Sequence, residues 1–138
     1  GSTYWQRWLE FNRDEILGRR FIHDYDLSIF EIARNPDEAL ECILRFYRNY
    51  HSARFVGERL VLRMKQAPEA ALAKLNEDFA DLLDHGEFQV IEPTSQERRD
   101  NDALDAQRLA FYPKHMYGRI RQLIDALNRL PVPETAPV

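Results

Sequence analysis

Residues 59–64 read RLVLRM, and this stretch decides the fold of the second half of the chain. Every second residue from Leu60 to Met64 is apolar, which is the period of a β-strand with one buried face. Pro68 then begins a predicted helix that ends at Gly86. The core stripe of this helix consists of Leu72, Leu75, Phe79, Leu82 and Leu83. A strand followed by such a helix indicates a sheet backed by helices.

The rest of the second half completes a βαββα order over residues 57–130. Residues 88–91 and 108–112 are predicted strands, and residues 116–130 are a predicted helix with one apolar face. The polar stretch 93–105 is predicted to be a flexible loop. We therefore predict an α/β (α+β) fold with a two-layer arrangement of sheet and helices. Its second half is expected to be a ferredoxin-like or ACT-like unit that lacks its closing strand.

The first half, residues 4–56, carries two amphipathic helices around a predicted strand. The first helix spans residues 4–17, and its apolar stripe is Trp5, Trp8, Leu9, Asn12 and Ile16. Residues 27–32, LSIFEI, are the predicted strand. Residues 35–38 supply an N-cap, a first-turn proline and a capping-box glutamate for the second helix, which is predicted to run to about Tyr50. Its buried face would be Leu40, Ile43, Leu44, Tyr47 and Tyr50. The predicted strand, or a second subunit, would complete the sheet of the second half.

Composition argues against several classes of function. The net charge of -4 disfavours non-specific binding to nucleic acid, which needs an excess of basic residues. The single cysteine, Cys42, excludes an internal disulfide and is predicted to be a small buried thiol. The four histidines are widely spaced, so no metal site is predicted. The sequence also lacks a Gly-rich phosphate loop and a nucleophile elbow, so no catalytic residue or cofactor is predicted. No apolar run reaches the roughly 20 residues of a membrane span, which predicts a cytoplasmic protein without a membrane partner.

One stretch, RFYRNYHSARF at residues 45–55, is a candidate binding site for an anion or nucleotide. Arg45, Arg48 and Arg54 would hold phosphate, while Tyr50 would stack on a base. The alternative interpretation is that the aromatic residues belong to the core and that the arginines are solvated or paired with acidic side chains. Residues 1–3 are interpreted as the remnant of an expression tag, and residues 131–138 as a disordered tail.

Residues 4–50 resemble the closing segment of the LOG (Lonely Guy) family. The resemblance rests on the aromatic pair Tyr4-Trp5, the acidic stretch 24–26, the strand-like stretch 27–32 and the turn NPDEA at residues 35–39. In that family an aromatic pair opens a late helix, and a turn of this type starts the last one. Residues 46–52 and 119–128 are similar to a C-terminal extension in a bacterial subgroup of the family.

The resemblance implies a Rossmann-like parent that hydrolyses nucleoside 5′-monophosphates to base and ribose 5-phosphate. The family signature Pro-Gly-Gly-x-Gly-Thr-x-x-Glu is absent here, so no catalytic residue carries over. Residues 4–56 would close the parent's Rossmann-like domain, and residues 57–130 would form an appendage acting in assembly or regulation. The implied partners are the rest of that parent domain and a second copy of the chain. The alternative is an ACT-type module that binds a small ligand at a dimer interface, and a third, more distant hypothesis is an RNA-binding sheet.

Overall fold

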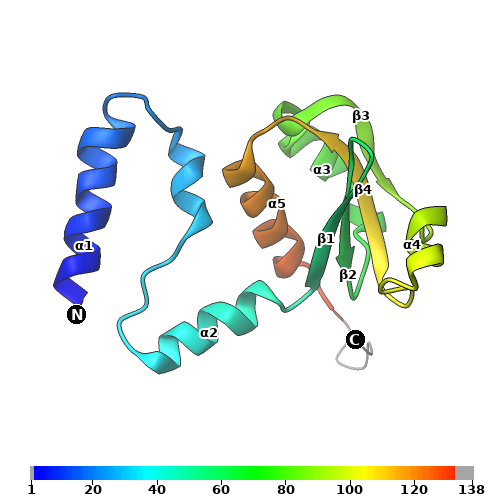
Figure 1. Ribbon diagram of the computed structural model, residues 1–138, viewed down its shortest axis with the longest axis horizontal. Helices are drawn as coiled ribbons and strands as arrows, with labels where there is room; N and C mark the ends of the chain where they lie inside the picture. Colours follow the sequence, from blue (N-terminus) through cyan, green and yellow to red (C-terminus); the bar gives the residue numbers. More distant parts are fainter. Residues whose placement is uncertain (1, 133–138) are drawn as a thin grey trace.

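The computed structural model describes residues 2–132, and its centre is one antiparallel sheet of four strands (Figure 1). In sheet order these are β1 (Tyr50–Val56), β2 (Arg59–Met64), β4 (Gln107–Pro113) and β3 (Leu83–Val90). Helices pack against this sheet, so the predicted α+β class is confirmed. The predicted strands at residues 59–64 and 108–112 correspond to β2 and β4, and the predicted strand at residues 88–91 overlaps the end of β3.

The order of the strands is that of a split βαβ unit. Leu62 of β2 lies opposite Leu109 of β4, and β4 in turn pairs antiparallel with β3. Strands β2 and β3 therefore run in the same direction with β4 between them. β1 pairs with the free side of β2, in the position that a closing strand would take. The chain thus completes its own sheet, and the expectation that residues 27–32 or a second subunit would do so is wrong.

A tight hairpin explains why β1 forms where a helix end was predicted. Val56 pairs with Arg59, so only two residues make the turn, and Gly57 adopts φ +62° there. Such two-residue turns need positive φ, which glycine adopts without strain. The predicted second helix therefore ends earlier, as α2 (Pro36–Phe46), and Tyr50 begins the strand.

One face of the sheet packs against α3 (Leu72–Asp78) and α5 (Tyr117–Arg129) and forms the core. The predicted stripe residues Leu75, Phe79 and Leu82 are buried in it. The helix around them is shorter than predicted, because 3-10 turns at Glu69–Ala71 and Ala80–Leu82 flank α3 and the chain enters β3 at Leu83. The remaining core residues are Leu60, Leu62, Met64, Phe88, Leu109, Phe111, Leu123, Ile124 and Leu127.

The polar stretch 93–105 is structured, contrary to the prediction of a flexible loop. It contains the short helix α4 (Ser95–Asp100), which lies on the other side of the sheet from α5 (Figure 1). Thr94 caps this helix and forms a reciprocal capping box with Glu97. Glu97 is fully buried, and its contacts fix the stretch in place.

The first half of the chain forms an arm. α1 (Ser2–Phe11) continues into one π-helical stretch (Asn12–Leu17), and a 3-10 helix, η2 (Asp24–Ile29), precedes α2. The predicted strand 27–32 is therefore wrong, since its first three residues belong to η2. Asn35 caps α2 as predicted, because its side chain accepts a hydrogen bond from the amide of Glu38 at 2.9 Å. Figure 1 places α1 at the end of the molecule remote from the sheet.

Among residues 2–132, no helix has the length and apolar character needed to cross a bilayer. The predicted tag remnant and tail lie partly outside this range, since residue 1 and residues 133–138 are not described.

Candidate functional site

The four predicted anion-binding residues do not converge on one site. Arg45 pairs with Glu31, and Arg54 pairs with Asp102 at 2.8 Å on the α4 side of the sheet. The ring of Tyr50 is half-buried against the core, while Arg48 is exposed. The alternative interpretation therefore describes the placement of Arg45, Tyr50 and Arg54 better, because each is taken up by contacts within the chain.

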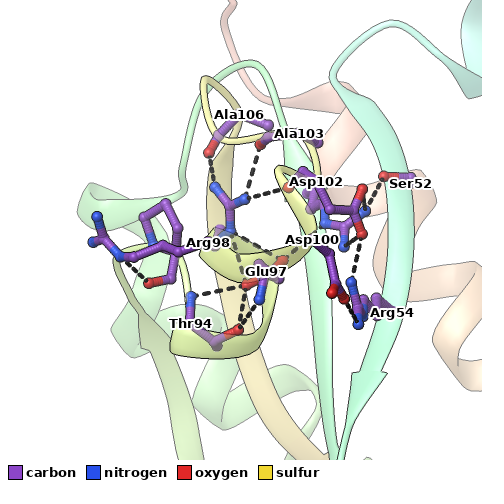
Figure 2. A network of polar contacts seen from close by, with 12 residues as sticks. Ser52, Arg54, Thr94, Glu97, Arg98, Asp100, Asp102, Ala103 and Ala106 are labelled. Carbon is purple, nitrogen blue, oxygen red and sulfur yellow. Dashed lines mark hydrogen bonds and ion pairs between the residues drawn. The ribbon is translucent and has the colours of Figure 1, made fainter.

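Arg54 belongs instead to a network of charges between the sheet and α4, which is buried at its centre and partly exposed around Arg54 (Figure 2). Its centre is the carboxylate of Glu97. Arg63 of β2 donates to this carboxylate through Nε at 2.9 Å, and Arg108 of β4 donates through Nε at 3.2 Å. The amide and hydroxyl of Thr94 donate to the other carboxylate oxygen, both at 2.9 Å. Each carboxylate oxygen of Glu97 therefore accepts at least two hydrogen bonds.

A second carboxylate, that of Asp102, extends the network toward β1. Arg63 grips it with both terminal nitrogens, at 2.7 and 3.1 Å, and Arg54 adds a bond at 2.8 Å. The other end of Arg108 donates to the backbone oxygen of Ala103 at 2.8 Å. Ala103 has a left-handed φ of 49°, a conformation that non-glycine residues adopt rarely. The backbone at Ala103 thus adopts an unfavourable conformation in which its carbonyl accepts a hydrogen bond from the buried guanidinium of Arg108.

These contacts keep both acids ionised. Burial by itself raises the pKa of Glu97, but hydrogen bonds from Thr94 and Arg63 and the charge of Arg108 outweigh it and hold that pKa below its ordinary value. The bond from Arg54 lowers the pKa of Asp102 against a smaller effect of desolvation, and Arg63 lowers it further. With Asp100, which also pairs with Arg54, three carboxylates balance three guanidiniums. The network therefore has a structural role, because its charged side chains are paired with one another and not free to bind a ligand.

The sequence analysis did not predict this network, although the sequence contains two indications of it. Thr94 and Glu97 have the spacing of a capping box, which marks a helix start inside the polar stretch. Arg63 and Arg108 also interrupt apolar strands, which is unusual unless a buried acid is nearby.

A different surface lies on the N-terminal arm, defined here as residues 2–47. Ten of its large apolar side chains are exposed, with between 36% and 72% of their surface accessible. They are Tyr4, Trp5, Trp8 and Phe11 of α1, Phe21 and Ile29 of the connection, and Leu40, Ile43, Leu44 and Tyr47 of α2. The face of α2 that was predicted to be buried is therefore the face that the chain leaves uncovered. Both helices present apolar stripes at helical spacing that residues 2–132 cover only in part, with Phe30 packed against Trp8 and Tyr50 against Tyr47.

An extended segment lies between these two helices. Within residues 2–132, the backbone groups of residues 31–33 form no hydrogen bond. Phe30 packs against Trp8 with ring centroids 4.7 Å apart, beside a hollow of about 270 Å³. A second hollow of about 310 Å³ lies toward α2, lined in part by Ala33 and Ile43. Phe30 and Asn35, at the two ends of the segment, have extended backbone angles, and the segment has apolar space near it and no strand partner within residues 2–132.

Polar contacts hold the inner side of the arm to α5. Gln122 donates to the hydroxyl of Ser28 at 2.9 Å, and Arg121 donates to the carboxylate of Glu31 at 2.7 Å. Gly118 of α5 is needed for this approach, because a Cβ there would lie 2.2 Å from the carbonyl oxygen of Tyr25. The arm is therefore anchored on one side and apolar on the other.

The junction between α2 and β1 is anchored by Asn128 of α5. Its side-chain oxygen accepts from the amides of Asn49 and Tyr50, both at 2.9 Å, and its nitrogen donates to the carbonyl of Phe46 at 2.6 Å. This buried asparagine fixes the direction in which α2 leaves the sheet.

Among the described residues no group of three His, Cys, Asp or Glu side chains is placed to hold a metal ion. Cys42 is half-buried and contacts Glu31 and Arg45. Comparison of the chain with family models, with curated proteins and with solved structures found no match. The resemblance to the LOG family stays a prediction from the sequence.

Proposed function

We propose that this chain is an accessory domain that docks, through its N-terminal arm, on a nucleotide-hydrolysing domain of the LOG type. The observation that carries the proposal is the pair of uncovered apolar stripes on α1 and α2, on either side of an extended segment without a strand partner. A monomer rarely exposes a contiguous apolar surface of this kind unless another surface covers it.

The order of elements in the arm suggests that it docks on the edge of a parallel sheet in the partner domain. Helix, extended segment and helix follow one another in the chain, which is the repeating order of a doubly wound fold. In such folds a strand is covered on both faces, and its apolar residues alternate between the two. Phe30 faces α1, while Ala33 borders both hollows, the one beside α1 and the one toward α2. The unpaired backbone of residues 31–33 would add to the sheet of the partner domain as a further strand.

The second half of the chain, from β1 to α5, would then act in assembly or regulation. Its core is continuous and the charges around Glu97 are balanced, while Nε of Arg59 is a buried donor without a hydrogen-bond acceptor among the described residues. We expect the chain alone to give no turnover of AMP, because the resemblance places the phosphate-binding signature in the parent domain. Free adenine and ribose 5-phosphate would be measured after incubation with the chain alone and with the longer natural protein.

The docking proposal is tested by one substitution in two contexts. Leu44→Glu should leave the stability of the chain alone nearly unchanged, because Leu44 is exposed there. In the longer natural protein, produced with the sequence that precedes Tyr4, the same change should cost about 2 kcal/mol or more, because it puts a charge into an apolar interface. Glu41→Gln, on the exposed polar side of α2, is the matched control. Equal effects of Leu44→Glu in both contexts would contradict the proposal.

A further inference from the structure

A cavity of about 490 Å³ lies at the end of the sheet where the β1–β2 hairpin, the start of β3 and the start of α5 meet. Its volume falls in the range of small-molecule sites. Among residues 48–132, the only exposed large apolar side chains are Phe55, with 51% of its surface accessible, and Tyr117, with 61%, and both line this cavity. Uncovered aromatic surface in the second half of the chain is therefore concentrated at one hollow.

The cavity wall is also fixed in place. Tyr112 is stacked on His85 with ring centroids 4.2 Å apart, and His85 in turn contacts the carboxylate of Asp84 at 2.9 Å. Lys114 donates one hydrogen to the carbonyl of Asp81 at 3.1 Å, which leaves the other hydrogens of its ammonium for another acceptor. These contacts orient His85 and Lys114 before any ligand arrives.

The charges on the wall have both signs. Lys114 supplies a cation, while Glu58 and Asp84 supply carboxylates. A purely anionic ligand would meet two carboxylates, and a purely cationic ligand would meet the ammonium of Lys114. A ligand that carries an ammonium and a carboxylate together would find an opposite charge for each, and its ring would cover the exposed aromatic side chains.

We propose that this cavity binds a small zwitterionic aromatic molecule of the kind represented by a free aromatic amino acid. The carboxylate of the ligand would lie toward Lys114, its ammonium toward Glu58, and its ring against Phe55 and Tyr117. The inference uses no residue of the N-terminal arm, so it stands or falls independently of the docking proposal.

The test is a titration of the chain with L-tryptophan, followed by calorimetry, with two probes that each lack one charge. Tryptamine has no carboxylate, and indole-3-propionate has no ammonium. L-tryptophan should bind saturably, and Phe55→Ala should weaken it about tenfold or more. The control is Phe21→Ala, which removes an even more exposed ring from the arm and should change nothing.

Charge variants assign the orientation. Lys114→Gln should weaken L-tryptophan and indole-3-propionate several-fold but should not weaken tryptamine. Glu58→Gln should weaken L-tryptophan and tryptamine but should not weaken indole-3-propionate. Absence of saturable binding below about 1 mM would overturn the proposal. So would equal loss in Phe55→Ala and Phe21→Ala, or charge variants that affect all three probes alike. Circular dichroism of each variant confirms that it is folded.

Discussion

Replacement of Glu97 by glutamine tests how much the buried charge network contributes to stability. Glu97 is 0% exposed, and its partners Arg63 and Arg108 are 4% and 0% exposed. Glutamine keeps the size of the side chain and its ability to close the capping box with Thr94, but it removes the charge that both guanidiniums face. Removal of one partner of a buried ion pair typically costs about 3–5 kcal/mol. That is a large share of the roughly 5–15 kcal/mol by which a domain is stable.

The assay is urea unfolding followed by far-UV circular dichroism, because both tryptophans lie in the arm and their emission reports on it instead. With a slope of about 2 kcal/mol per molar urea, the expected loss moves the midpoint down by roughly 2 M. Glu87→Gln is the matched control, since Glu87 is exposed on the edge strand β3. A Glu97→Gln midpoint equal to that of the control would refute the reasoning that Arg63 and Arg108 depend on this carboxylate.

Three further predictions concern the charge network, the anchor of the arm on α5 and the hydrophobic core. The pKa values of Glu97 and Asp102 are lowered in the folded state, so the stability that these acids contribute is present above their unfolded pKa of about 4 and is lost as the pH falls through the folded values. The free energy of unfolding, measured by denaturation from about pH 6 to pH 3, should therefore decrease toward acid pH. The decrease should be less steep in Glu97→Gln. Gly118→Ala should loosen the arm from α5, because its Cβ would clash with the backbone of Tyr25, and limited proteolysis should then cut the arm sooner than in the unaltered chain. Phe79→Ala should cost about 3–5 kcal/mol in thermal or chemical unfolding, because the ring is buried in the core, and an unchanged melting curve would contradict the core assignment.

The sequence predicted those parts of the fold that a single local pattern determines. Alternating apolar residues located β2, and the cap at Asn35 located the start of α2. It failed at Tyr50, where the residues suited both the end of a helix and the start of a strand. The two-residue turn at Gly57 and pairing with β2 decided in favour of the strand, and pairing is a property of the folded chain that local propensity does not contain.

The charge network and the apolar arm were misjudged for related reasons. Polar residues at 93–105 indicated a loop, because the pattern does not show that Arg63 and Arg108 lie across from Glu97 in the folded chain. The stripe from Leu40 to Tyr47 was correctly identified as a face that needs covering, but the chain does not cover it. Periodicity reports that a face is to be buried, and it does not report which molecule will bury it.

Hydrogen exchange at the backbone amides of residues 31–33 tests the docking proposal most directly. These amides have no hydrogen-bond acceptor within residues 2–132, so in the chain alone they should exchange within the fastest class. In a protein that carries the proposed parent domain ahead of Tyr4, strand pairing with that domain should slow them to the rate of amides in a paired sheet. Amides that exchange equally fast in the two proteins would contradict the proposal that the arm docks by adding a strand.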